Sequence, residues 1–571
     1  MKPKSTFPAF IVLVTVILFD CQTKYQFEQY PYQATKVAVG NSGMLVSPHP
    51  LSSQVGVEIL RKGGNAIDAA IAVQFAMAVV YPRAGNLGGG GFMVIRLANG
   101  DHDALDYREK APLAATRNMY LDSSGNVIPD LSRAGILAVG VPGTVAGMVA
   151  AHQKYGRLKF NELVKPAVQL AKIGFGVTQS EANRLNSFKE QFIQHNSTNI
   201  PFVKEKWSAG DLLIQPELAN VLARIMAKGK AGFYQGPTAN SIVKVMEAKS
   251  GLITYDDLSQ YQPAWRKTVS GFYRDHQIIS MPPASSGGVA LLQMLKMVEN
   301  YPLSKYGIHS VASMHLMAEA ERRAFADRAE FLGDMDFYEV PLDSLLNENY
   351  LKLRMKNFNE ENATVSKSVH AGDFSIGKES YETTHTSVID SEGNAVSVTT
   401  TLNSNYGCKV MAAGFFLNNE MDDFSAKPGV PNQFGLLGAE ANAIQPGKRM
   451  LSSMTPTIVL KKNKPFLILG TPGGSTIITS VFQVIVNVID FGLDLPEAVE
   501  TARFHHQWLP DRILVEREKF PPHILDSLRN KGHQIDEART LGMVKAIQVF
   551  DDGSYQGVGD YRNPDDDARG F

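Results

Sequence analysis

Cysteine is nearly absent from this sequence of 571 residues, which contains only Cys21 and Cys408. A metal site built from several thiolates is therefore excluded by count. If Cys21 is removed or lipidated, no internal disulfide can form. The fold must then be held by a hydrophobic core, which a chain of this length can bury without covalent cross-links.

An excess of charge of either sign is also missing. Lys and Arg together number 56 and Asp and Glu 57, which leaves a formal net charge of −1. This balance provides no electrostatic attraction to nucleic acid or to an anionic membrane surface. We therefore expect no nucleic-acid partner, and a small substrate that is recognised locally.

A phosphate-binding loop is lacking too, although one glycine-rich segment is superficially similar to one. Residues 85–91 read Gly-Asn-Leu-Gly-Gly-Gly-Gly, but no Gly-Lys-Ser/Thr follows. Residues 92–97 have the pattern of a strand, where such a loop needs a helix. We expect close packing of the backbone at these glycines, not nucleotide binding.

The N-terminus has the pattern of an export signal. Lys2 and Lys4 precede an apolar run over residues 7–19, which is too short for a comfortable transmembrane helix. We expect residues 1–21 to be a signal peptide and the protein to be exported, to the periplasm or the cell surface. An uncleaved membrane anchor is the alternative.

Cys21 makes a lipoprotein signal a further alternative, in which this residue carries a lipid anchor. Asp20 argues against it, because small residues normally precede that cleavage site. Residues 22–33 are polar and aromatic without a period and are expected to form a linker.

Helical patterns surround a part of the chain that is rich in strands. Residues 65–80 are apolar almost all round, as in a helix buried between layers. Residues 141–360 are mostly helical in pattern, and 308–331 form one long amphipathic segment. The last third has strand patterns over 386–390, 395–401, 457–461 and 466–469, followed by a helix over 475–488. Strands inside and helices outside predict an α+β fold of four layers, a helix–sheet–sheet–helix (αββα) sandwich.

Several stretches resemble a known family. The segment from residue 383 reads Thr-Thr-His-Thr-Ser-Val-Ile-Asp, and further matching stretches lie at 401–403, 417–425, 451–456, 470–475 and 502–506, with others at 63–70 and 106–109. Together they resemble the γ-glutamyltranspeptidases, which are N-terminal-nucleophile hydrolases. A threonine pair before a strand means little by itself, but so many matches in order, from about residue 37 to 571, are specific.

The resemblance implies that the chain cuts itself between Glu382 and Thr383 and then uses Thr383 as its nucleophile. A threonine hydroxyl needs a nearby base, and the α-amine freed by the cut, with a pKa near neutrality, can be that base. Thr401 matches the position that orients the nucleophile. The large subunit, 34–382, and the small subunit, 383–571, are expected to stay together as a heterodimer.

An acyl transfer also needs donors aimed at the oxyanion that forms. Gly473 and Gly474 match the family's oxyanion-hole backbone amides. A glycine pair that opens a helix presents free N–H groups at the positive end of the helix dipole. A tight turn from strand to helix also requires glycine, and both interpretations can hold together.

A γ-glutamyl substrate has an amino-acid head, whose carboxylate needs donors and whose ammonium needs acceptors. The family's carboxylate contacts are matched by Arg108, Ser452 and Ser453. Its ammonium contacts are matched by Asn403, Glu420 and Asp423. Some members have Gln at the position of Glu420, and a loop of solvated acids is the alternative interpretation.

One position departs from the family's pattern. Phe434 stands in the lid loop where well-known bacterial members have Tyr, which retains an aromatic cover but loses its hydroxyl. Two other features carry no chemistry of their own in our interpretation. His505 and His506 are adjacent and point different ways, which makes a poor metal pair. Cys408 is expected to be a small buried thiol.

The sequence therefore predicts a γ-glutamyltransferase and glutathione hydrolase that needs no metal or organic cofactor. Its partners would be glutathione and other γ-glutamyl compounds, with water, an amino acid or a peptide as acceptor. A related acylase acting on a β-lactam side chain is the alternative enzyme, against which the head-group contacts argue. A non-catalytic exported binding protein is the alternative of another class, against which Thr383, Thr401 and the glycine pair argue.

Overall fold

A computed structural model describes residues 25–196, 199–370, 383–430, 432–433 and 435–571 of the chain. The predicted signal peptide with Cys21, the residue Glu382 before the expected cut, and Phe434 all lie outside the described residues. Within those residues, no helix is both long and apolar enough to cross a membrane.

Two seven-stranded sheets, each antiparallel throughout, form the centre of the molecule. The first sheet has the order β1 (Val37–Gly40), β20 (Tyr555–Gly559), β19 (Lys545–Val549), β15 (Lys464–Gly470), β14 (Thr457–Lys461), β9 (His276–Ser280) and β8 (Val269–Tyr273). The second sheet has the order β21 (Asp567–Gly570), β2 (Gly43–Ser47), β10 (Thr384–Asp390), β11 (Ala395–Thr401), β3 (Gly90–Arg96), β4 (His102–Asp106) and β7 (Ala264–Arg266). Both sheets therefore combine strands from before and after residue 383.

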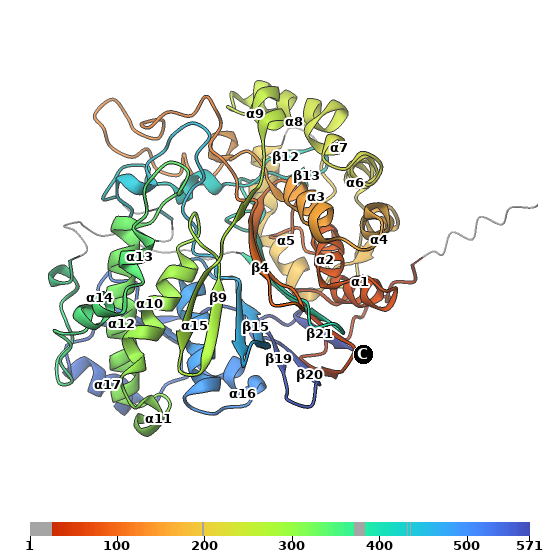
Figure 1. The fold of residues 1–571 in the computed structure, drawn as a ribbon. Coiled ribbons are helices and arrows are strands. Elements are labelled where there is room, and N and C mark those ends of the chain that lie inside the picture. Colours follow the sequence, from red (N-terminus) through yellow and green to blue (C-terminus); the bar gives the residue numbers. More distant parts are fainter. Residues whose placement is uncertain (1–24, 197–198, 371–382, 431, 434) are drawn as a thin grey trace, which may run out of the picture.

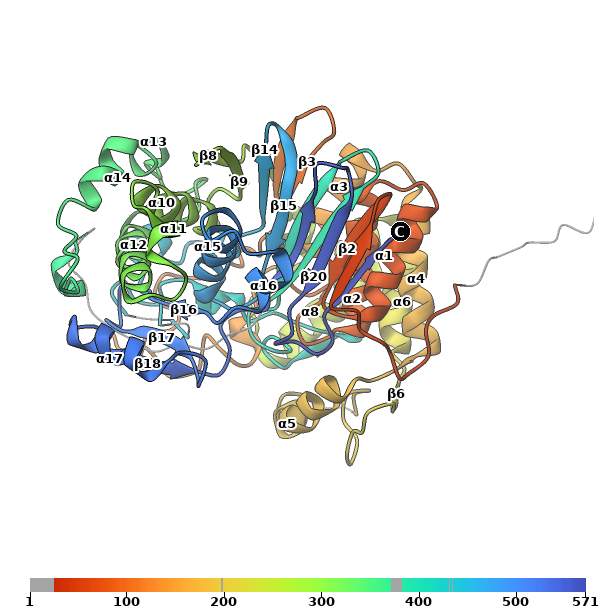
Figure 2. The same ribbon diagram turned by 90° about the horizontal axis from the view of Figure 1, so that it is seen from below.

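Helices cover the outer face of each sheet, as Figures 1 and 2 show. The second sheet packs against α1 (Pro50–Arg61), α2 (Ala66–Val80), α3 (Thr144–Tyr155), α4 (Phe160–Ile173), α6 (Pro216–Lys228) and α8 (Gly236–Lys249) through one hydrophobic core. The first sheet packs against α10 (Gly287–Glu299), α12 (Val311–Phe331) and α15 (Thr476–Ile489) through another. A third core lies between the sheets, with Phe92 and Val94 facing Ile458 and Ile468. The predicted helix–sheet–sheet–helix sandwich is confirmed.

Most of the predicted elements are present with small shifts of their ends. The apolar segment 65–80 forms α2, in which every residue is buried and Asn65 and Asp68 make a capping box at the start. The middle third is mostly helical, but β8 and β9 interrupt it and extend the first sheet. The segment predicted to be amphipathic, 308–331, forms α12, which is buried on nearly all sides because other layers cover its polar face.

The glycine-rich segment packs closely against the hairpin of β10 and β11. A Cβ atom at Gly89 would lie 2.1 Å from the Thr401 carbonyl oxygen, and one at Gly91 would lie 2.4 Å from the Thr399 carbonyl oxygen. Real Cβ atoms do not approach backbone this closely, so only glycine fits at both positions. The prediction of close backbone packing is confirmed, and it concerns the strand that carries Thr401.

The mixed composition of both sheets leads to a first prediction. If the chain is cut before Thr383, β10 still pairs with β2 and β11 still pairs with β3 from the other fragment. The fragments should therefore co-elute in size-exclusion chromatography under native conditions and separate only in denaturant. Elution of the smaller fragment alone in native buffer would contradict this shared core.

Candidate active site

Strand register places two threonines opposite each other. Thr384 of β10 pairs with Thr400 of β11, and continuing this antiparallel pairing by one residue puts Thr383 opposite Thr401. Both are buried, with exposed fractions of 7% and 3%. The Thr401 hydroxyl accepts a hydrogen bond of 2.7 Å from the Asn403 backbone N–H. The predicted nucleophile and its orienting residue therefore come from neighbouring strands of one hairpin.

The alternation of side chains along β10 distinguishes Thr383 from Thr384. Ser387 and Ile389, which share a face with Thr383, point toward the first sheet, where Ser387 donates to the Lys545 carbonyl. Thr386, which shares a face with Thr384, points toward α2 and contacts Met77. Thr383 therefore faces the space between the sheets, whereas Thr384 faces a packed helix.

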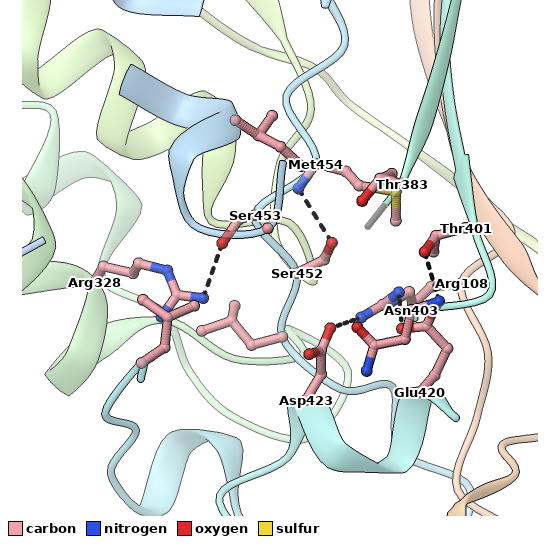
Figure 3. Close-up of a pocket in the computed structure, with 14 residues that line it drawn as sticks. Arg108, Arg328, Thr383, Thr401, Asn403, Glu420, Asp423, Ser452, Ser453 and Met454 are labelled. Carbon is pink, nitrogen blue, oxygen red and sulfur yellow. Dashed lines mark hydrogen bonds and ion pairs between the residues drawn. The ribbon is translucent and has the colours of Figure 1, made fainter. Parts of the chain in front are cut away.

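A cavity opens beside Thr383, with about 300 Å³ of empty space including its mouth. All six predicted substrate contacts line it, as do the two threonines and Gly474; the full lining is Arg108, Arg328, Thr383, Thr401, Asn403, Glu420, Asp423, Leu436, Leu451, Ser452, Ser453, Met454, Gly474 and Ile477. Figure 3 shows these side chains converging on the space beside Thr383. Residues that are more than 300 positions apart in the chain thus meet at one site.

Arg108 is surrounded by carboxylates. Its Nη1 lies 2.5 Å from Glu420 Oε2 and 3.6 Å from Glu109 Oε2, and its Nη2 pairs with Asp423. Burial raises the pKa of the Asp423 carboxyl to about 8, an effect that Arg108 opposes and Glu420 reinforces. Burial likewise raises the pKa values of Glu420 and Glu109. The groups predicted to hold the two charges of a substrate head thus pair with each other.

The serine pair lies across the cavity from Arg108 (Figure 3). The Ser452 hydroxyl accepts a hydrogen bond of 3.2 Å from the Met454 N–H. The Ser453 hydroxyl accepts one of 3.3 Å from Arg328 Nη2. Each hydroxyl retains a hydrogen that it can donate to an anion in the cavity.

The glycine pair lies between the end of β15 and the start of α15. Gly473 has φ of 144° and Gly474 φ of 55°, values at which a side chain would be strained. No residue in the described part of the chain accepts a hydrogen bond from either N–H. Gly474 lines the cavity, whereas Gly473 and Thr383 line a wider groove on the other side of Thr383. Two donors at a helix start thus flank the nucleophile.

The lid position can be judged only from its neighbours, because Phe434 is not described. Leu436 lines the cavity, and Gln433 accepts a hydrogen bond from Ser404 and donates its backbone N–H to Asp422. Leu436 therefore belongs to the cavity, and the lid role of the Phe434 ring stays a prediction.

Arg328 is a cavity residue that the sequence analysis missed. It lies near the end of α12, and its guanidinium is buried against Ser286 and Ser453. In the sequence, Arg328 stands among other charged residues such as Asp327 and Glu330, so no local signal distinguished it as a buried ion. The amphipathic interpretation of this helix concealed it.

The remaining polar clusters have structural partners. His505 and His506 point apart, His505 bonding to Thr479 and His506 to Asp511. Burial raises the pKa of the Cys408 thiol to about 12, as expected of an inert buried cysteine. Among the described residues, His315, Glu319 and His533 bring donor atoms close enough for a cation. The Glu319 carboxylate, however, is already paired with Arg322 and Arg323.

Comparison with known proteins shows which family and fold the chain is similar to. The family model for gamma-glutamyltranspeptidase matches residues 52–569. A glutathione hydrolase proenzyme of Escherichia coli (strain K12) is 47% identical over 534 residues, which cover 93% of this chain and 92% of the relative. The crystal structure of Helicobacter pylori gamma-glutamyltranspeptidase is 46% identical with a TM-score of 0.56, over 60% of this chain and 99% of that chain. A cephalosporin acylase from Bacillus halodurans shares the fold, with a TM-score of 0.81 at 24% identity over 96% of this chain and 99% of that chain.

The charge arrangement predicts the behaviour of Asp423→Asn. The substitution removes one acceptor for a substrate ammonium but leaves Arg108 paired with Glu420, so the fold should survive. For γ-glutamyl-p-nitroanilide we expect KM to rise about 10- to 100-fold, the worth of a hydrogen bond to a charged group, with little change in melting temperature. A KM within twofold of that of the unaltered protein would contradict the assignment.

The raised pKa of Asp423 adds a dependence on pH to the same measurement. Binding of the substrate ammonium needs the Asp423 carboxylate in its ionised form. Because the pKa of this carboxyl lies at about 8, its ionised fraction increases as pH rises from 6.5 to 8.5. KM of the unaltered protein should fall over this range, and Asp423→Asn should have a flatter profile. Identical profiles would show that another group controls the binding of the head.

Proposed function

Since the chain belongs to the γ-glutamyltranspeptidase family, we propose that it takes the γ-glutamyl group of glutathione and related γ-glutamyl amides onto Thr383 and passes it on. Water as acceptor gives glutamate, and an amino acid or peptide gives a new γ-glutamyl compound. The observation that carries the proposal is the cavity in which Thr383 and Thr401 meet charged groups of both signs.

The first step is the cut that matures the enzyme. The hydroxyl oxygen of Thr383 attacks the carbonyl carbon of Glu382, the peptide C–N bond breaks, and the nitrogen gains the proton that the hydroxyl loses and becomes an amine. Water then hydrolyses the resulting ester and restores the hydroxyl. Before the cut this nitrogen is an amide and cannot act as a base; afterwards it is a free amine next to the hydroxyl that it must activate.

Catalysis repeats the same chemistry on the substrate. The free amine takes the proton of the Thr383 hydroxyl, and the oxygen attacks the γ-carbonyl carbon. The N–H groups of Gly473 and Gly474 stabilise the oxyanion, and they suit this role because nothing described accepts from them. The leaving amine, which is cysteinylglycine when glutathione is the donor, departs with the proton. Water or an acceptor amine then attacks the ester.

The head of the substrate binds by replacing the ion pairs that Arg108 forms with Glu420 and Asp423. Its ammonium replaces Arg108 as the partner of Glu420 and Asp423, and its carboxylate replaces these acids as the partner of Arg108. Because both exchanges occur together, the net charge of the buried site does not change. A zwitterionic head therefore fits better than a head with a single charge, since the latter would leave one protein charge unpaired.

The same set of contacts argues against the two alternatives. An acylase of β-lactam side chains shares the fold, as the likeness to the Bacillus halodurans enzyme indicates, but the paired charges of this cavity suit the amino-acid head of a γ-glutamyl group. A binding protein has no need for Thr383, Thr401 and two glycine N–H groups that no described residue accepts from, all in one place. The side chains and backbone of this chain supply every group that the proposed steps use.

We also propose that the protein is exported, to the periplasm or cell surface, with residues 1–21 removed as a signal peptide. The support is the sequence pattern of Lys2, Lys4 and the apolar run over 7–19. Intact mass spectrometry of protein from its native cell should give a large fragment that begins after about residue 21. A diacylglycerol-type mass increase on Cys21 would identify the lipoprotein alternative, and a fragment that starts at Met1 would contradict export by cleavage.

The choice of Thr383 as nucleophile leads to a prediction with a neighbouring control. Thr383→Ala should remain one chain and be inactive, whereas Thr383→Ser should cut itself slowly and retain some activity because the hydroxyl survives. Thr384→Ala should still cut before residue 383, since Thr384 faces α2. N-terminal sequencing of the small fragment decides the matter. A fragment that begins at residue 384, or full activity without any cut, would overturn the mechanism.

A further inference from the structure

Arg328 is a second buried guanidinium in the cavity, on the side away from Arg108 (Figure 3). Only 4% of its surface is exposed. Its Nε donates to Ser286 Oγ at 2.9 Å, and its Nη2 donates to Ser453 Oγ at 3.3 Å. In the part of the chain that the structure describes, no carboxylate forms an ion pair with it.

The two guanidiniums therefore differ in how their charge is compensated. Arg108 has Glu420 and Asp423 as direct partners, with Glu109 close by. Arg328 has hydroxyl partners only, and Asp423 is the one acid whose charge acts on it appreciably. Burial lowers the pKa of Arg328 to about 10, so it stays charged at neutral pH without a direct counter-ion. A buried cation of this kind is costly unless an anion comes to it.

Arg328 also fixes the serine pair. Ser286, which accepts from Arg328, donates its own hydroxyl hydrogen to the Ser452 carbonyl at 2.7 Å. Ser453 accepts from Arg328 directly, which leaves the Ser453 hydroxyl hydrogen to be donated elsewhere. One guanidinium thus holds both serines in place and directs the Ser453 hydroxyl toward an acceptor in the cavity.

We propose that Arg328 is a positioning residue that determines specificity for a carboxylate on the substrate head, acting through Ser453 and by its own uncompensated charge. This inference rests on the proposed γ-glutamyl transfer and deepens it. A neutral side chain could make the same hydroxyl contacts without the cost of burying a charge. The charge becomes favourable when a carboxylate enters the cavity. Substrates that carry a carboxylate therefore bind better than substrates that lack one.

Three p-nitroanilides separate the charges of the head. The γ-glutamyl compound has both charges, the 4-aminobutyryl compound lacks the carboxylate, and the glutaryl compound lacks the ammonium. For Arg328→Gln we expect KM to rise about 10- to 100-fold with the γ-glutamyl and glutaryl compounds, with a smaller change in kcat. KM for the 4-aminobutyryl compound should stay within about twofold of that of the unaltered protein. The variant should therefore lose the preference of the enzyme for substrates that carry a carboxylate.

Two further variants test whether Arg328 acts on the substrate carboxylate through Ser453. Ser453→Ala should reduce the same preference, and the double variant should be much less impaired than the product of the two single effects, because the residues act together. Arg96→Gln is a matched control, since Arg96 is also buried and, among the described residues, bonds only to the carbonyl oxygens of Gly393 and Asn463. It should leave the preference unchanged.

Self-cleavage and the melting temperature report whether each variant folds. If Arg328→Gln does not mature, Arg328→Lys keeps the charge but cannot reach both hydroxyls, and it should raise KM for the two carboxylate substrates only. A variant of either kind that matures and shifts all three substrates equally, or none, overturns the inference. Failure of the unaltered protein to release p-nitroaniline from the γ-glutamyl compound would instead overturn the proposed function.

Discussion

The pairing of β10 with β11 is the constraint on which the rest of the site depends. It places Thr383 opposite Thr401, and the two-residue period of a strand turns both toward the space between the sheets. A shift by one residue would point Thr383 at α2 and bring Thr384 to the cavity instead. Close packing of Gly89 and Gly91 against β11 opposes such a shift, because no other side chain fits between these backbones.

The second feature of the site is that buried charges of opposite sign compensate one another. A zwitterionic ligand adds no net charge to this arrangement. Arg108 opposes the rise in the carboxyl pKa values of Glu420 and Asp423 that burial causes, and these acids in turn make a buried guanidinium tolerable. Arg328 stands outside this balance, held by two hydroxyls. These charges suit a ligand that brings one charge of each sign, and in our proposal the cation on the serine side favours the end that carries the carboxylate.

Fold and maturation chemistry also support each other. The proposed nucleophile directly precedes a strand at the centre of a sheet, with β2 on one side and β11 on the other. A cut just before Thr383 would break no ladder hydrogen bond in the described residues, so we expect the new N-terminus to stay in place beside Thr401. The same sheet thus allows the chain to be cut without loss of the core, and it fixes the amine where the hydroxyl needs it.

The sequence by itself predicted the layered fold, from its helix and strand patterns. It also singled out the two threonines, the glycine pair and the six residues proposed to contact the substrate head, because each belongs to a short stretch whose order along the chain is distinctive. It also indicated the close packing at residues 85–91, since such a run of glycines has few other uses. Only the tertiary structure decided that Arg108 is paired with Glu420 and Asp423, and that Arg328 lines the cavity without a carboxylate ion pair among the described residues. The physical reason is that charge compensation depends on distances between residues far apart in the chain, which local pattern and composition do not specify.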